Sequence, residues 1–162
     1  MIPYLQTLIS RELDALAREV KAYPDDDSPW KVVPGCPNTG GNLTLHLGGN
    51  LRHFIGAQLG KTGYVRHRDV EFSTRGGVSR GELLRLIEAA RSEVRTTLSA
   101  LDLSVLNQIH LAPGDRQIET GLWLTHLAVH LGYHLGQIDY HRRTVTGDSS
   151  SVDALPLQAL VK

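Results

Sequence analysis

The chain has 162 residues, with 17 Lys and Arg against 17 Asp and Glu, eight histidines and one cysteine. This length suits one domain with its own hydrophobic core, and the balanced charge excludes the strong field that draws a protein to nucleic acid or to an anionic membrane. The single cysteine, Cys36, excludes an intramolecular disulfide framework and favours a reducing compartment, so we expect a soluble cytoplasmic protein.

The N-terminal segment predicts an amphipathic helix that ends near Tyr23-Pro24. Its apolar residues repeat every three or four positions, which places them on one helical face. They are Leu5, Ile9, Leu13, Leu16 and Val20. Because Arg11, Glu12 and Asp14 interrupt this segment, we expect no signal peptide, and no apolar run in the chain reaches the roughly 20 residues of a membrane span.

A proline- and glycine-rich connection, PDDDSPWKVVPGCPNTGG, leads to a second predicted helix, for which Asn42 is a candidate N-cap. The apolar stripe of this helix consists of Leu47, Leu51, Ile55 and Leu59. The stretch that follows, KTGYVRHRDVEFSTRGG, is polar and predicts a connection. A third helix then opens at Ser79 and Glu82, which form a capping-box pattern. Its stripe consists of Leu83, Ile87, Ala90, Val94, Leu98 and Leu101.

Residues 107–111 and 116–118 predict two brief extended stretches around Pro113-Gly114. A fourth helix is expected over about residues 122–143, with an apolar stripe at Leu124, Leu127, Leu131, Leu135 and Ile138. The tail, residues 147–162, is rich in Ser and Asp and is expected to be loosely held. The sequence therefore predicts an all-α four-helix bundle over residues 1–146, followed by a C-terminal tail.

Four of the eight histidines lie in one stretch of the fourth helix, HLAVHLGYHLGQIDYH. At about 100° per residue, His126, His130, His134 and His141 fall within an arc of roughly 80°. His130 and His134 are one turn apart, so their rings can converge on a single metal ion. Two ligands are too few for a stable site, and a third is therefore expected on another element.

The second helix offers that ligand. His46 begins a stripe, His46, Asn50, His53 and Ala57, that lies beside the apolar stripe and so near the bundle interior. Three histidines with open coordination positions describe a catalytic rather than a structural site. Water bound there could be acidic enough to act as hydroxide near neutral pH.

The other histidines have simpler explanations. We expect His53 to be a satisfied partner at the bundle edge, and His141 to interact with the macrodipole near the helix end. His67 and His110 are expected to be solvated in loops. Three roles stay open for His126: a fourth metal ligand, a group that supports a ligand, or a substrate contact. Cys36 precedes the second helix and could approach a site at that end of the bundle.

The segments LTLHLGGNLRH (residues 43–53) and LTHLAVHLGYHLGQIDYHRR (residues 124–143) resemble the DinB-like family of four-helix metalloproteins. The resemblance implies an up-down-down-up bundle, a homodimer, and a metal held by His46, His130 and His134. Gln137 matches the glutamine that closes the family motif, and is expected to orient a ligand or line the cavity. Where relatives often have paired histidines before the final Gly-Gln, this chain has Tyr133-His134.

Assigned activities in that family imply a thiol-dependent transferase or isomerase, in which the metal activates a low-molecular-weight thiol. The leading hypothesis is therefore a divalent-metal enzyme acting on a small molecule, with Asn50, His126 and Gln137 as pocket contacts. Zinc or nickel is the expected metal, with iron or copper as alternatives. No H-E-x-x-H, Gly-rich phosphate loop, Gly-x-Ser-x-Gly or Glu-x-x-His pair points to other chemistry.

Two other functions stay open. One is a hydrolase in which metal-bound hydroxide attacks an ester or amide. The other is a metal-binding or ligand-sensing bundle without turnover. We expect no obvious general acid or base carboxylate near the three histidines, and this absence favours a bundle without turnover.

Overall fold

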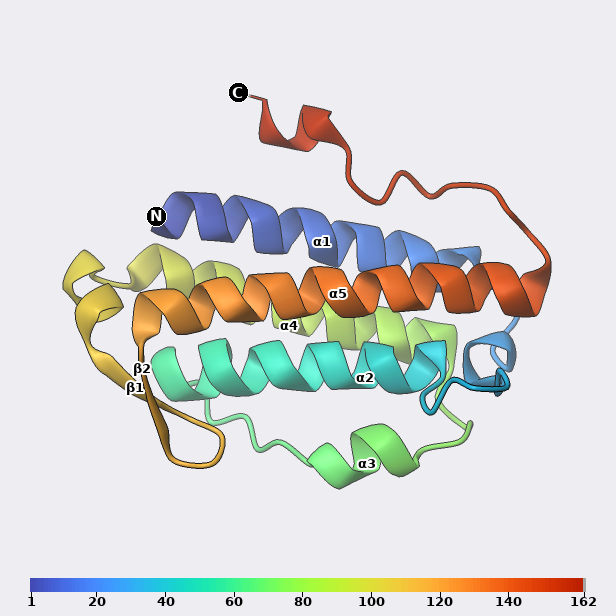
Figure 1. Ribbon diagram of the computed structural model, residues 1–162, viewed down its shortest axis with the longest axis horizontal. Helices are drawn as coiled ribbons and strands as arrows, with labels where there is room; N and C mark the ends of the chain where they lie inside the picture. Colours follow the sequence, from blue (N-terminus) through green and yellow to red (C-terminus); the bar gives the residue numbers. More distant parts are fainter. Residues whose placement is uncertain (162) are drawn as a thin grey trace.

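The computed structural model describes residues 1–161, most of which lie in four long helices (Figure 1). These are α1 (Ile2–Ala22), α2 (Gly40–Leu51), α4 (Arg80–Ala100) and α5 (Thr120–Thr146). α1 packs against α4 and α5, and α2 packs against the same two helices. α1 and α5 run in one direction and α2 and α4 in the other (Figure 1). The predicted all-α, up-down-down-up bundle is therefore confirmed.

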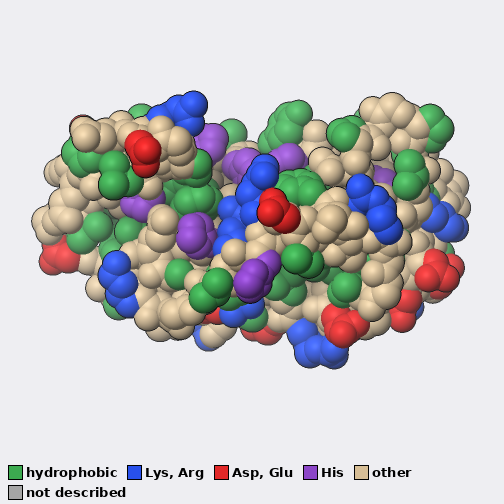
Figure 2. Space-filling model, turned by 90° about the horizontal axis from the view of Figure 1, so that it is seen from below, with side chains coloured by type: hydrophobic (Ala, Val, Ile, Leu, Met, Phe, Trp, Pro, Cys, Tyr) green, Lys and Arg blue, Asp and Glu red, His purple; other side chains and the backbone are tan. Residues whose placement is uncertain are grey.

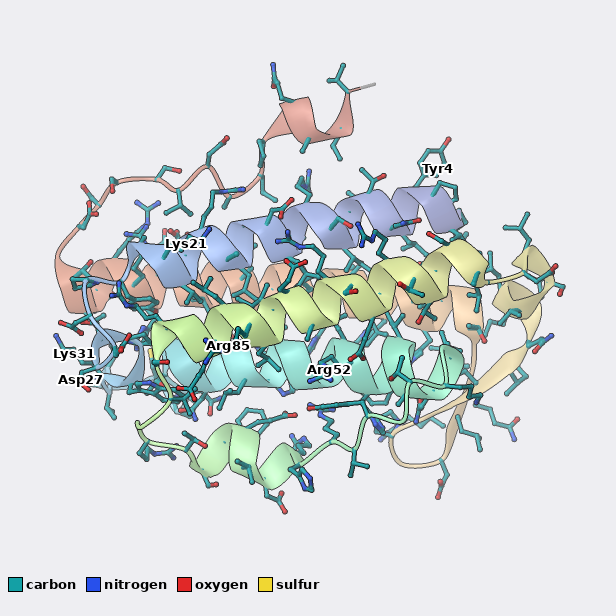
Figure 3. All side chains as sticks on the ribbon, turned by 180° about the vertical axis from the view of Figure 1, so that it is seen from behind. Tyr4, Lys21, Asp27, Lys31, Arg52 and Arg85 are labelled. Atoms are coloured by element: carbon teal, nitrogen blue, oxygen red, sulfur yellow. The ribbon has the colours of Figure 1, made fainter. Side chains whose placement is uncertain are left out.

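The predicted apolar stripes form the core. Every stripe residue of the first and fourth predicted helices is buried, as are all but the last of the second and third, Leu59 and Leu101, which are half-buried. Full burial of one such side chain contributes about 1.5–3 kcal/mol. Figure 3 shows the bundle from behind, with α4 crossing in front of α2. Within the part of the chain that the structure covers, no helix is long and apolar enough to cross a membrane.

The second predicted helix changes its winding part-way along. After Leu51 the α-helix continues as a π-helical segment, Arg52–Leu59 (η2). A π-helix takes more residues per turn than an α-helix, so positions beyond Leu51 no longer follow the face that a 3.6-residue period predicts. His53, which the α-helical stripe places in line with His46, is affected by this change.

The cap of α2 differs from the prediction. The N-cap is Thr39, and Asn42 is the third residue of the helix, where it completes the capping box with its Oδ1 accepting from the Thr39 backbone N–H. The Asn42 amide nitrogen also donates to the backbone oxygens of Glu71 and Thr74, at 2.9 and 2.8 Å. Asn42 therefore fastens a later segment of the chain against the start of α2. The predicted capping box of α4, Ser79 with Glu82, is confirmed.

That later segment contains α3 (Arg68–Ser73), a helix of six residues which lies beside α2 and which the sequence predicted only as a polar connection (Figure 1). The two predicted extended stretches form an antiparallel hairpin, β1 (Ile109–Ala112) with β2 (Arg116–Glu119). Three short 3-10 turns complete the fold, η1 (Ser28–Trp30), η3 (Leu103–Asn107) and η4 (Leu157–Leu160).

The C-terminal tail, predicted to be loosely held, is largely exposed but contacts the bundle at several points. It returns along α1 (Figure 1), where Arg18 donates to the backbone oxygens of Val152 and Asp153. Arg142, fully buried and paired with Glu19, also donates to the Ser150 backbone oxygen. These contacts attach the tail to the bundle through backbone acceptors, which composition alone does not reveal.

Candidate metal centre

The structure brings His46, His130 and His134 together. His46 lies on α2, and the two others lie one turn apart on the neighbouring helix α5. Each histidine offers one ring nitrogen, and the three atoms lie within 4.8 Å of one another. The ring centroids of His130 and His134 are 4.5 Å apart, and those of His46 and His134 are 5.3 Å apart. The three imidazoles therefore form one cluster between two helices.

The cluster has dimensions that suit a cation. The Nε2 atoms of His46 and His130 are 3.2 Å apart. Two nitrogens bound tetrahedrally to one ion at about 2.0–2.1 Å would lie roughly 3.3–3.4 Å from each other. Three neutral imidazoles suit zinc, nickel, copper or iron, and less so the oxygen-seeking ions calcium and magnesium. These residues therefore fit the group that the sequence predicts.

The other ring nitrogen of His46 is held by an acidic residue. Its Nδ1 lies 3.0 Å from Glu71 Oε2 and 3.1 Å from Arg66 Nη2. Arg66 Nη2 already donates to Glu71 Oε2, and in the tautomer in which His46 Nδ1 donates to that carboxylate too, Nε2 keeps its lone pair. Arg66 donates to both carboxylate oxygens of Glu71 at 2.7 Å. A carboxylate that orients a histidine in this way is a common second contact around protein-bound metals.

His134 is oriented similarly, from within its own helix. Its Nδ1 donates to Gln137 Oε1 at 2.6 Å, which leaves Nε2 free on the other side of the ring. The predicted role of Gln137 in orienting a ligand agrees with this contact. Gln137 does not line the histidine cleft but lines a neighbouring cavity of about 410 Å³, together with Asn38 and the exposed Cys36. Cys36 does not line the histidine cleft either.

Burial keeps two of the ligand candidates, His130 and His134, neutral. Burial first, and then the neighbouring His134 and His46, lower the pKa of His130 to about 4. Burial also lowers the pKa of His134, although its hydrogen bond to Gln137 works in the opposite direction. Burial alone would raise the pKa of Glu71, but hydrogen bonds from His46 and Arg66 lower it overall, so that its carboxylate is ionised. Near pH 7, His130 and His134 thus offer imidazole lone pairs rather than imidazolium protons.

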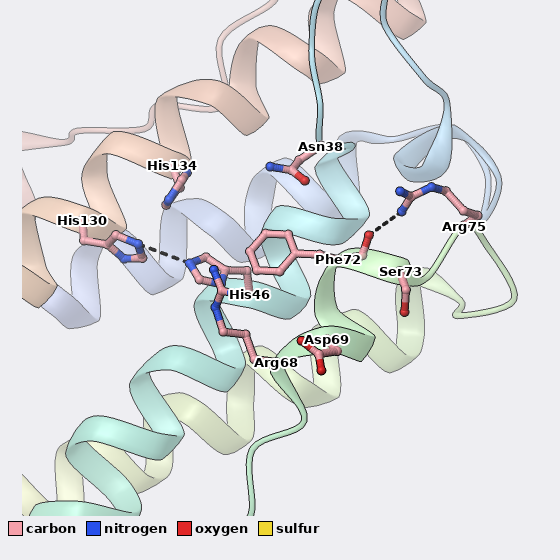
Figure 4. Close-up of a pocket in the computed structure, with 9 residues that line it drawn as sticks. All are labelled: Asn38, His46, Arg68, Asp69, Phe72, Ser73, Arg75, His130 and His134. Atoms are coloured by element: carbon pink, nitrogen blue, oxygen red, sulfur yellow. Dashed lines mark hydrogen bonds between the residues drawn. The ribbon is translucent and has the colours of Figure 1, made fainter. Parts of the chain in front are cut away.

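The histidines open onto a cleft of about 820 Å³ between α5 and α3 (Figure 4). Its walls are formed by Asn38, His46, Arg68, Asp69, Phe72, Ser73, Arg75, His130 and His134. The Phe72 ring packs against His46 with centroids 4.8 Å apart. Figure 2 views the molecule from the side of α3, where histidines lie next to Lys and Arg side chains near the middle of the face.

Other predicted pocket contacts lie elsewhere. Asn50 is buried on α2 and its Oδ1 has no hydrogen-bond partner within residues 1–161, but it does not line the cleft. His126 is exposed and stacks on Trp123, with its ring centroid 6.1 Å from that of His130. It does not belong to the group of three converging nitrogens. His53 is half-buried, and only its Nε2 has a partner, Gln58, among the described residues.

Two further histidines differ from expectation. His141, predicted to interact with the macrodipole near the helix end, is buried: its Nε2 donates to the Lys31 backbone oxygen and its Nδ1 accepts from the Tyr23 hydroxyl. His110 is half-buried and stacks on Trp123 rather than being solvated. His67 is exposed, as predicted.

The expectation that no carboxylate lies near the three histidines is wrong. Glu71 contacts His46 directly, and Asp69 lines the cleft. Both lie in the polar stretch between the second and third predicted helices. The available signal was weak: a glutamate between Val70 and Phe72, five residues after Arg66. Nothing in that spacing indicates which helix the glutamate contacts.

Comparison with known proteins agrees with this architecture. The family model described as the DinB superfamily matches residues 8–138, a span that includes His46, His130 and His134. No curated protein and no solved structure gives a significant match. Because the match extends over most of the chain, and the fold is the expected helical bundle, this chain belongs to the DinB superfamily.

Proposed function

We propose that this protein is a divalent-metal enzyme that transfers a low-molecular-weight thiol to a small electrophilic molecule. The observation that carries the proposal is the convergence of three imidazole nitrogens, within 4.8 Å of one another, on an open cleft. Structural zinc sites are usually closed by four protein ligands, whereas three ligands facing a cleft leave a position for a substrate atom. Zinc or nickel is the proposed metal, with iron or copper as alternatives.

The chain's own residues would prepare the site for this chemistry. Glu71 and Gln137 hold the Nδ1 protons of His46 and His134, so both Nε2 lone pairs stay directed at one point. Burial keeps His130 neutral. A divalent cation held by these three histidines would lower the pKa of a coordinated thiol and hold its sulfur towards an electrophile.

The proposed transfer is balanced without an oxidant or reductant. The S–H bond of the thiol breaks, a sulfur–carbon bond forms, and the bond from that carbon to its leaving group breaks. The proton departs with the leaving group. A reducing compartment, predicted from the single cysteine, would keep the thiol substrate reduced.

The first test is metal content. The purified protein, reconstituted with zinc or nickel, is expected to bind one equivalent by elemental analysis, and His130→Ala to lose most of it. His67→Ala removes an exposed histidine outside the cleft and serves as the matched control. A metal-free wild-type protein, or a His130→Ala protein with unchanged metal content, would contradict the proposal.

The second test separates the reaction classes. The metal-loaded protein is assayed for adduct formation between a thiol and a reactive electrophile, and separately for ester hydrolysis without thiol. Thiol adducts formed faster than in the His130→Ala variant would support the transferase. Hydrolysis alone would favour the hydrolase, and tight metal binding without either activity would favour a sensing bundle.

A further inference from the structure

Arg68, the first residue of α3, extends toward His46 at the edge of the histidine cleft (Figure 4). It lines two cavities at once. One is the cleft of about 820 Å³ that contains His46, His130 and His134, and the other is a cavity of about 410 Å³ against the β-hairpin. A ligand atom bound at the three histidines and a group bound to Arg68 would thus share the histidine cleft.

The charge of Arg68 is not neutralised by the protein. Within residues 1–161 its guanidinium forms no ion pair and no hydrogen bond, whereas the nearby Arg66 is fully engaged with Glu71. Arg68 is held by an aromatic contact instead, with its Cζ 4.9 Å from the centroid of the Phe72 ring. Phe72 in turn packs on His46. The guanidinium is therefore positioned beside the metal centre with its donors unused.

The remaining charges of the cleft leave an excess of positive charge. Arg68 and Arg75 line it, against the single carboxylate of Asp69. Arg75 donates to the backbone oxygens of Phe72 and Thr74 at the end of α3, so it too has no acidic partner in the described structure. A guanidinium with free donors is the protein group best suited to a carboxylate, which it can bind through two parallel hydrogen bonds.

We propose that the thiol substrate carries a carboxylate and that Arg68 binds it while the sulfur lies at the three histidines. This inference rests on the proposed thiol transfer and specifies its substrate class: a small acidic thiol rather than a neutral one. Arg68 is then a substrate-binding residue that sets specificity, and it takes no part in holding the metal.

The test compares two small thiols that differ in charge, 3-mercaptopropionate and 2-mercaptoethanol. Each is titrated into cobalt-loaded protein, and binding is followed by the sulfur-to-cobalt charge-transfer absorption, a readout independent of turnover. Arg68→Gln is expected to weaken 3-mercaptopropionate binding roughly tenfold and to leave 2-mercaptoethanol unchanged, because only the acidic thiol loses a charge-assisted hydrogen bond. The difference in basicity between the two thiols cancels when their affinity ratio in the wild type is compared with their ratio in Arg68→Gln.

The matched control is Arg85→Gln, which removes the same charge from an exposed arginine of α4 that does not line the cleft (Figure 3). This variant is expected to bind both thiols as the wild type does. In the wild type, added salt is expected to weaken 3-mercaptopropionate selectively, since it screens the ionic contact. This salt titration needs no variant and so does not depend on how well Arg68→Gln folds.

The outcomes separate this inference from the proposed function. If both thiols bind to the cobalt protein with the same affinity ratio in the wild type and in Arg68→Gln, and salt does not change that ratio, the role of Arg68 is overturned while thiol binding stands. If neither thiol changes the cobalt spectrum, the proposed thiol transfer fails, and this inference fails with it.

Discussion

Glu71 has a central position at the scale of single residues. It is buried and accepts hydrogen bonds from both His46 and Arg66. It holds the imidazole proton of His46 on Nδ1, so that Nε2, which points toward the other histidines, keeps its lone pair. A carboxylate in this position makes the ligand more basic and fixes its orientation. It does not act as a free general base, because Arg66 occupies both of its oxygens.

Glu71→Gln is therefore expected to weaken metal binding about 10- to 100-fold, as substitutions of such supporting partners do. The dissociation constant is measured by competition with a chelator of known affinity. Glu88→Gln, which removes a carboxylate from an exposed ion pair with Arg91, is the control and is expected to leave the affinity unchanged. Equal affinities for all three proteins would show that Glu71 does not support His46.

Acid is expected to destabilise the metal-free protein through histidines whose pKa is lowered by burial. Burial, followed by the charges of His134 and His46, lowers the pKa of His130 to about 4, and an unfolded histidine titrates near about 6.5. Between these values the unfolded chain binds a proton that the folded protein does not, so the free energy of unfolding falls as the pH is lowered through this window. Burial lowers the pKa of His134 and of His141 as well, with the same sign.

Glu19 opposes this trend over part of the range, because burial raises its pKa to about 6 from an ordinary value of 4.5. Urea unfolding of the metal-free protein at several pH values between about 7.5 and 4.5 measures the sum. His130→Asn is expected to flatten the loss of stability below about pH 6.5. A variant whose stability falls as steeply as that of the wild type would contradict the assigned cause.

At the scale of elements, α2 and α3 meet so closely that one position allows only glycine. A Cβ added at Gly49 would lie 2.2 Å from Glu71 Oε1 and 3.1 Å from its Cδ. Glu71 has no freedom to move aside without releasing Arg66 or His46. Gly49 therefore lets α3 approach α2 and place its carboxylate beside His46.

Gly49→Ala is expected to lower the free energy of unfolding by roughly 1–3 kcal/mol through overpacking, and to weaken metal binding because it displaces Glu71. Gly132→Ala on α5 is the matched control, because its Cβ would meet nothing within 4 Å. That change is expected to stabilise the protein by up to about 1 kcal/mol, since alanine favours the helix. Denaturant unfolding and chelator competition measure both effects, and the same result for the two variants would contradict this account.

The long elements could be predicted because each carries an apolar stripe over several turns. The three clustered histidines could be found for the same reason, since His130 and His134 are one turn apart and His46 lies near the interior face of its helix. The short helix α3 could not, because six residues give no periodicity. The π-helical turn after Leu51 is equally invisible to a 3.6-residue pattern. Glu71 was missed because its contact with His46 depends on where α3 packs.

At the scale of the whole molecule, the tail is joined to the core through Arg142. This guanidinium is fully buried with Glu19, and it also donates to the backbone oxygens of Asp148 and Ser150. These contacts could not be predicted from composition, because the acceptors are backbone atoms, which any residue provides. The separation of a bundle, residues 1–146, from a tail remains a prediction.

Deletion of residues 148–162 tests that separation. The truncated bundle is expected to keep its helical circular dichroism and its metal, but to lose about 1–3 kcal/mol of stability because the buried Arg142 loses acceptors. Urea unfolding measures the loss. A truncated chain that does not fold would show that the tail belongs to the domain, and unchanged stability would show that its contacts contribute nothing. Homodimerisation likewise remains a prediction, which light scattering of the intact chain can check.

The central claim, that His46, His130 and His134 hold one divalent metal, is tested most directly by crystallography. Crystals grown with zinc are measured on both sides of the zinc absorption edge. We predict a single anomalous peak between α2 and α5, in bonding contact with a nitrogen of each of the three histidines. Strong zinc peaks only at other sites, or none at the cluster in fully loaded crystals, would contradict the account.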